Sequence, residues 1–204
     1  MRFYLSSFKV GKQSGLLSSL YGDGPVGYVA NALDHVSDEK WLNDWIAADI
    51  GQLAEAGVRA QLFDLREFFA ANADIGSAVS ALGGIWISGG NVFVLRQAMK
   101  LSGLDTFLLS DGVSSRFVYG GYSAAACVLS PSLRPYALVD DPDIHPYPQS
   151  QTTIWEGLGV LDFAFMPHFE SQHPESELID KEVAYCQEHG IPYQTFRDGE
   201  VLIV

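Results

Sequence analysis

The sequence predicts a three-layer α/β fold with a mostly parallel central sheet, and two observations lead to this fold class. Short apolar runs of strand length alternate with longer stretches whose apolar residues recur at helical spacing. This alternation is typical of βαβ units, in which helices cover both faces of a parallel sheet. Two glycine-rich turns, at 88–91 and 119–123, each fall where an apolar run ends. Ligands gather at the carboxyl ends of such strands, so we expect the functional residues at these turns.

The predicted strands are short, rich in β-branched and aromatic residues, and bounded by turn residues. In chain order they are RFYLSSF (2–8), VGYVANA (26–32), VRAQLFDL (58–65), GIWISGG (84–90), RFVYGG (116–121) and LDFAFMP (161–167). Between the second and third strands, Ser37 is a candidate cap for a helix that continues to Gly57. A later helix ends at Gly190, just before the helix-stopping Pro192.

Length and composition predict one domain over residues 1–204 and exclude several classes of partner. The chain is 48% hydrophobic, which is enough for a large core, and carries a net charge of −13. This charge repels phosphate backbones and anionic lipids, so we expect neither nucleic acid nor membrane partners. No run approaches about eighteen apolar residues, and the N-terminus lacks a secretory pattern, so we expect a cytoplasmic protein. No feature predicts the oligomeric state, and a homodimer is left open.

Ser123 is the first candidate for chemistry, because it stands alone in the small-residue stretch GGYSAAACVL (120–129). A strand ending at Tyr119 runs into two glycines, and a helix of small residues opens directly after the serine. This pattern favours a nucleophile elbow, a sharp strand-to-helix turn that exposes the serine Oγ. The N–H of Ala124, at the start of the new helix, would point the same way and could stabilise an oxyanion. The alternative is a helix of small residues that packs tightly on the sheet.

A serine nucleophile needs a base, and among the five histidines His168 is the best candidate. It directly follows the apolar strand 161–167, which places it at the edge of the sheet where the elbow lies. His173 is the rival, five residues further along the chain. An acid that orients the imidazole would complete the set, and Asp140, Asp141 and Asp143 lie in a stiff proline-rich loop between serine and histidine.

The second glycine turn, SGGN (88–91), supplies the remaining requirement. Gly89 or Gly90 can offer an unobstructed N–H to a developing oxyanion, and Asn91 can either cap the following helix or bind substrate. The turn has neither the G-x-G-x-x-G pattern nor a P-loop lysine, and the two cysteines have no metal-binding spacing. We therefore expect neither a metal nor another cofactor.

These pieces together resemble peptidase E and its relatives in the serine peptidase S51 group, which includes cyanophycinase. The segments that carry the resemblance are SGGNVFVL (88–95), GGYSAAACVLSPSLR (120–134), FMPHF (165–169) and YQTFRDGEVLIV (193–204). The resemblance implies a class I glutamine amidotransferase-like α/β sandwich, with Ser123 as nucleophile and His168 as general base. It also implies an oxyanion hole at Gly90 and Ala124, substrate contacts at Gly89 and Asn91, and Asp141 as the third catalytic residue.

The sequence also departs from this family in ways that bear on activity and substrate. The elbow usually reads G-x-S-A-G, whereas Ala125 occupies the last position here. Relatives that prefer an N-terminal aspartate carry arginine beyond the histidine, but residues 169–196 contain no arginine, one lysine and six acids. Arg96 and Arg134 are the remaining candidates to bind a carboxylate. We therefore expect a peptidase of short peptides, of the dipeptidase or exopeptidase type, with little preference for N-terminal aspartate.

Two other functions remain open at this stage. An α/β-hydrolase-type esterase would share the chain order Ser123, Asp141, His168, although the spacing from serine to histidine is short for that fold. A catalytically weak or inactive binding protein on the same scaffold is the second alternative, because fold alone does not imply function.

Overall fold

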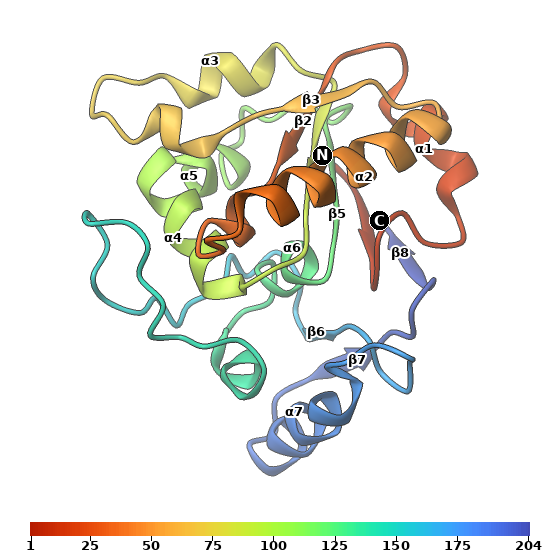
Figure 1. The fold of residues 1–204 in the computed structure, drawn as a ribbon, viewed down its shortest axis with the longest axis vertical. Coiled ribbons are helices and arrows are strands. Elements are labelled where there is room, and N and C mark those ends of the chain that lie inside the picture. The colour runs from red at the N-terminus through yellow and green to blue at the C-terminus, as the bar shows by residue number, and fades with distance from the viewer.

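The computed structural model describes all residues from Met1 to Val204 and shows the predicted α/β architecture, with helices on both sides of a central sheet (Figure 1). Six strands form this sheet in the order β3-β2-β4-β5-β1-β8. Their bounds are β1 (Arg2–Ser6), β2 (Val26–Val29), β3 (Ala60–Leu62), β4 (Gly84–Ile87), β5 (Val118–Tyr122) and β8 (Val201–Ile203). All neighbouring pairs are parallel except β1 and β8. The predicted mostly parallel sheet is therefore confirmed.

The helices form the outer layers. They are α1 (Leu17–Tyr21), α2 (Glu39–Glu55), α3 (Ile75–Ser80), α4 (Val92–Ser102), α5 (Leu104–Leu108), α6 (Ala124–Cys127) and α7 (Ser176–Glu188). The expected cap at Ser37 is wrong by one residue. Asp38 is the N-cap of α2, because its carboxylate accepts a hydrogen bond from the N–H of Trp41 at 3.0 Å.

Alternate side chains of the strands pack into two separate cores, as expected for a sheet covered on both faces. On one face, strand residues pack in the cluster that includes α4, α5 and α6; they are Leu5, Val29, Ile85, Ile87 and Tyr119. On the other face, strand residues pack in the cluster that includes Leu17 of α1 and Leu53 of α2; they are Tyr4, Val26, Tyr28, Trp86 and Val118. Strands β1, β2, β4 and β5 therefore each contribute to both cores.

The predicted strand at 161–167 forms, but it does not join the central sheet. Its ordered part, β6 (Ala164–Met166), pairs in parallel with β7 (Tyr193–Thr195) in a separate two-stranded sheet. In Figure 1 this small sheet and α7 lie together at the lower end of the molecule, beyond the central strands. After β7 the chain returns to the central sheet, where β8 pairs with β1. The sequence analysis did not identify β7 or β8 as strands. No helix combines the length and apolarity needed to cross a membrane.

Candidate active site

Ser123 lies at the predicted bend between a strand and a helix. It follows the last residue of β5, is the N-cap of α6, and has φ 51° and ψ −112°. A non-glycine residue in this region of backbone conformation is strained by about 1–3 kcal/mol, and such strain clusters at functional sites. Hydrogen bonds on both sides hold the bend: the Ser123 N–H donates to the Ser6 carbonyl at 3.1 Å, and the Ser123 carbonyl accepts from the N–H of Ala126 at 2.8 Å.

Small residues are required around the elbow because strand and helix approach closely. A Cβ atom on Gly121 would lie 2.5 Å from the Cβ of Ala125 and 2.4 Å from the carbonyl oxygen of Ile87. The methyl group of Ala125, the departure from the family pattern, is fully buried and is accommodated because position 121 has no side chain. The elbow therefore forms with Ala125 in place of the usual glycine.

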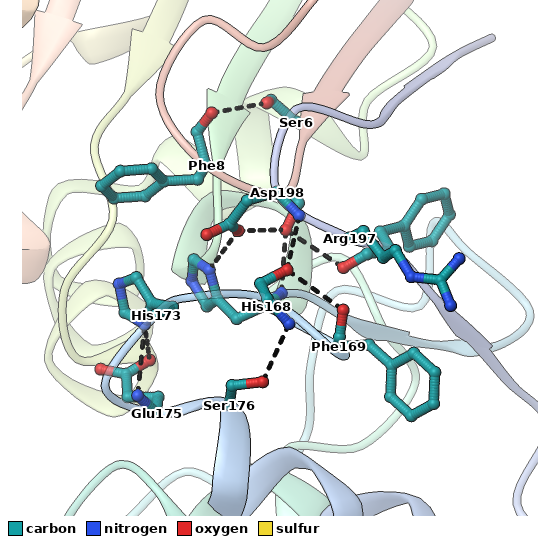
Figure 2. Close-up of polar contacts among 12 residues, drawn as sticks. Ser6, Phe8, His168, Phe169, His173, Glu175, Ser176, Arg197 and Asp198 are labelled. Atoms are coloured by element: carbon teal, nitrogen blue, oxygen red, sulfur yellow. Dashed lines mark hydrogen bonds and ion pairs between the residues drawn. The ribbon is translucent and has the colours of Figure 1, made fainter.

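His168 follows β6 by two residues and reaches the same cavity as Ser123. Its backbone has φ 58°, its side chain is 1% exposed, and its N–H donates to Ser7 Oγ at 2.8 Å. The ring is fixed by Asp198, whose Oδ1 lies 2.7 Å from His168 Nδ1 (Figure 2). An ionised carboxylate only accepts hydrogen bonds, so Nδ1 carries the proton. The other ring nitrogen, Nε2, is then left as the proton acceptor.

Asp198 is itself held in place from two sides. Ser7 Oγ donates to the same carboxylate oxygen at 3.0 Å, and the N–H of Asp198 donates to Ser171 Oγ at 2.8 Å. Ser7 therefore contacts both the backbone of His168 and the carboxylate that orients its ring. Neither Ser7 nor Asp198 was among the residues that sequence reasoning selected.

The expectation that Asp141 or a neighbouring acid orients His168 is wrong. The carboxylate of Asp140 accepts from the N–H of Val92 at 2.7 Å, at the start of α4. The carboxylate of Asp141 accepts from the N–H of Asp143 at 2.9 Å. This loop is therefore used to cap α4, whereas the residues after β7 bring Asp198 to the histidine.

The residues of the second glycine turn have two different roles, helix capping and lining of the cavity. Asn91 caps α4: its Oδ1 accepts from the N–H groups of Phe93 and Val94, and its Nδ2 donates to the Asp141 carbonyl. Both of its polar side-chain atoms are thus used within the fold, and Asn91 does not line the cavity beside Ser123. Gly89 and Gly90 do line this cavity. A side chain on Gly90 is prevented by its φ of 135° and by the Ala32 carbonyl oxygen, which would lie 2.6 Å from a Cβ atom.

Two backbone N–H groups beside Ser123 are free to stabilise an oxyanion. That of Gly90 makes no hydrogen bond within the protein. That of Ala124 belongs to the first residue of a helix, where no intrahelical acceptor exists. The family resemblance implies that these two groups form the oxyanion hole.

The cavity that joins these groups has a volume of about 170 Å³. Its walls are mostly aromatic and small, and its lining is Phe8, Leu33, Trp41, Trp45, Gly89, Gly90, Tyr122, Ser123, His168, His173 and Glu175. The tryptophans come from α2 and stack on each other with ring centroids 4.9 Å apart. Sequence reasoning did not select them, although both lie on the apolar face of the predicted helix.

His173, the rival base, stacks on His168 rather than replacing it. The two ring centroids are 3.7 Å apart and the planes differ by 12°. The pKa of His168 is lowered to about 4, first by burial and then by the neighbouring His173 ring, against the opposing effect of Asp198. His168 is therefore neutral at neutral pH, which is the state required of a general base.

One cluster in the site has the residue types of a metal site. The candidate ligand atoms of His168, His173 and Glu175 lie within 4.8 Å of one another. A histidine nitrogen directs its lone pair in the plane of the ring, and two stacked, nearly parallel rings direct theirs side by side rather than at one point. The stacked arrangement is therefore unsuited to chelation of a metal ion.

None of the basic side chains considered from the sequence lines the cavity. Arg96 pairs with Asp105 at 2.9 Å, and Arg134 lies 4.8 Å from the ring centroid of Trp155. Lys9 is close to the tryptophan wall, but its Nζ pairs with the buried Asp49 at 2.6 Å. A substrate carboxylate would therefore find no free cation in this cavity.

Fold and site together define an α/β protein with a serine at a strand-to-helix elbow and a histidine held by a carboxylate. The pattern of Peptidase family S51 matches residues 41–204 of the chain. The chain therefore belongs to peptidase family S51, a family of serine peptidases.

Similar proteins agree with this assignment. The chain is 31% identical over 100 residues to uncharacterized peptidase Lin0382 of Listeria innocua, and 29% identical over 97 residues to uncharacterized peptidase Lmo0363 of Listeria monocytogenes. These segments cover 49% and 48% of this chain, and 45% and 44% of the relatives, so less than half of each relative is matched.

Two solved structures share the fold. One is a Listeria monocytogenes EGD-e protein described provisionally as peptidase E, with a TM-score of 0.73, 20% identity, and coverage of 100% of this chain and 97% of that one. The other is a peptidase from an acI-B1 actinobacterium, with a TM-score of 0.60, 17% identity, and coverage of 100% and 82%.

Proposed function

We propose that the chain is a serine peptidase that hydrolyses amide bonds of short peptides. The observation that carries the proposal is the 2.7 Å contact between His168 Nδ1 and Asp198, in a cavity that His168 shares with the elbow residue Ser123. A neutral, oriented imidazole beside a strained serine has the arrangement needed to activate the hydroxyl. Membership of the S51 family supports the same chemistry.

In the proposed mechanism, Ser123 Oγ attacks the substrate carbonyl carbon while His168 Nε2 takes the hydroxyl proton. The N–H groups of Gly90 and Ala124 stabilise the oxyanion that forms. His168 then gives the proton to the leaving amine, which breaks the amide bond and leaves an acyl group on Ser123. Water, deprotonated by His168, attacks the acyl group, and His168 then gives this proton to Ser123 Oγ as the acyl–oxygen bond breaks and the acid leaves. Asp198 keeps the ring oriented and stabilises the imidazolium in each step.

A fluorophosphonate probe tests the nucleophile directly. It should label the wild-type protein at Ser123, and Ser123→Ala should abolish both the labelling and the hydrolysis of short peptides. Parallel assays on an ester and an amide of the same acyl group distinguish a peptidase from an esterase. Labelling without amide hydrolysis would contradict the proposed reaction, and no labelling would favour a non-catalytic binding protein.

The substrate preference proposed from the sequence is a short peptide with little or no requirement for N-terminal aspartate. The lack of a free cation in the cavity supports it, because a buried carboxylate needs a cation or several donors to replace its hydration. A dipeptide panel is the test. Asp-X substrates turned over tenfold better than Ala-X or Arg-X would contradict it, since tenfold corresponds to about 1.4 kcal/mol of discrimination. The cytoplasmic location and the expected lack of nucleic acid or membrane partners remain predictions from the sequence.

A further inference from the structure

Glu175 is the one acidic side chain that lines the cavity beside Ser123. It is the N-cap residue of α7 and lies on the segment that follows His168, close to His173 in Figure 2. Its only ion-pair contact is with His173, and the distance from His173 Nδ1 to Glu175 Oε2 is 3.8 Å, beyond hydrogen-bond range. The side chain is 42% exposed, so its oxygens can accept hydrogen bonds from a molecule that enters the cavity.

The rest of the lining favours a positive group near this carboxylate. No lysine or arginine lines the cavity, and Lys9 behind Trp45 is paired with Asp49. The aromatic walls from Phe8, Trp41 and Trp45 present faces that attract cations. A carboxylate flanked by aromatic rings can bind an ammonium group.

The size of the cavity indicates which amino group of a peptide could lie beside Glu175. The cavity volume of about 170 Å³ is enough for one amino-acid residue beside Ser123. With the scissile carbonyl at Ser123, a single residue on its acyl side fills the cavity. The positive group within that residue is its free α-ammonium.

We infer that Glu175 binds the free α-ammonium of the N-terminal residue and so restricts the enzyme to removal of one residue from an unblocked peptide. The inference rests on the proposed peptidase function and adds to it the residue that recognises the N-terminus. The side chain of that residue contacts Trp41, Trp45 and Phe8, which suits neutral or basic residues. An aspartyl side chain would instead bring a second carboxylate close to Glu175, and no lysine or arginine lines the cavity to offset it.

The test compares alanine p-nitroanilide with N-acetyl-alanine p-nitroanilide, which share an acyl side chain and a leaving group and differ in the free amine. The wild-type enzyme should prefer the free amine at least tenfold in kcat/KM. Glu175→Gln should reduce kcat/KM for the free amine at least tenfold, mainly through KM, and so remove most of the preference for the free amine over the acetylated substrate. The matched control is Glu177→Gln, an exposed acid two residues further along that does not line the cavity; it should behave as the wild type.

Fluorophosphonate labelling of Ser123 distinguishes failure of the Glu175 inference from failure of the proposed peptidase function. Labelling that persists in Glu175→Gln, together with selective loss of the free-amine substrate, supports the inference. Equal turnover of both substrates by the wild type, or a Glu175→Gln variant indistinguishable from it, would overturn the inference while leaving the peptidase function intact. Failure of the wild type to label or to hydrolyse either substrate would overturn the proposed function, and this inference with it.

Discussion

Glu182→Gln should stabilise the protein at neutral pH, because Glu182 is buried without a partner for its charge. The residue lies on α7, is 1% exposed, and its Oε2 has no hydrogen-bond partner. Its pKa is raised to about 9, mainly by burial and further by the nearby charges of Asp140 and Glu175. The folded protein therefore keeps a proton on Glu182 at pH values where the unfolded chain has lost it.

The magnitude follows from this difference in protonation. Between the ordinary value of 4.5 and the folded value of about 9, the folded state binds one more proton than the unfolded state. The free energy of unfolding therefore falls as pH rises, by at most about 1.4 kcal/mol per pH unit for one group. From pH 5.5 to 7.5 the effect of Glu182 amounts to about 2–3 kcal/mol, which is a large part of the stability of a typical domain. A glutamine side chain does not titrate in this range, so the free energy of unfolding of the variant should not show this decrease with rising pH.

Urea unfolding of the wild type and the variant at pH 5.5, 6.5 and 7.5 measures the effect. The stability advantage of Glu182→Gln should grow with each step in pH. Asp140, with a pKa raised to about 7 by burial, adds a pH dependence that is present in both proteins and largely cancels in the comparison. Glu188→Gln, an exposed change at the end of α7, is the matched control. A difference between wild type and Glu182→Gln that stays constant or shrinks as pH rises would refute the reasoning.

Three further predictions concern the site. Ser123→Ala should abolish hydrolysis and leave the melting temperature nearly unchanged, because one hydroxyl is removed; residual turnover above that of a mock preparation would contradict the assignment. Asp198→Asn should reduce kcat by about 10³–10⁴-fold by favouring the wrong His168 tautomer, whereas Asp141→Asn should leave kcat unchanged. Steady-state assays with the reverse pattern would show that Asp141, not Asp198, orients His168. His173→Phe keeps an aromatic ring against His168 but removes its charge, so the pKa of His168 should rise and the acid limb of the kcat/KM profile should move to higher pH; an unmoved limb would show that His173 has no electrostatic role.

The elbow and the histidine could be predicted from the sequence because their signals are local. Ser123 stands between a strand and a helix of small residues, and His168 directly follows an apolar strand. In both cases the short-range pattern that predicts the strand end also predicts the place of the functional side chain. The structure brings both residues to one cavity, even though β6 lies outside the central sheet.

The acid could not be predicted because its position depends on long-range pairing. Asp198 lies in the turn between β7 and β8, and it approaches His168 because β7 pairs with β6 and β8 pairs with β1. These strands are three residues long and weakly marked in the sequence. The acids that lie between serine and histidine in the chain have other partners: Asp140 accepts from the N–H of Val92 at the start of α4, and Asp141 accepts from the N–H of Asp143. The order found here, serine, histidine, aspartate, differs from that of the α/β-hydrolases and removes the main argument for that alternative.

The placement of Asp198 also determines when, during protein synthesis, the site can become active. The ribosome adds Ser123 and His168 well before Asp198 and β8, so a growing chain contains the nucleophile and its base before the group that orients the base. Ser7 is present from the start, but its bond to the Asp198 carboxylate cannot form until the later segment has emerged and paired with β1. Chains that terminate between His168 and Asp198 would retain the serine yet lack an oriented imidazole. We therefore expect efficient peptide hydrolysis only after β8 has been made.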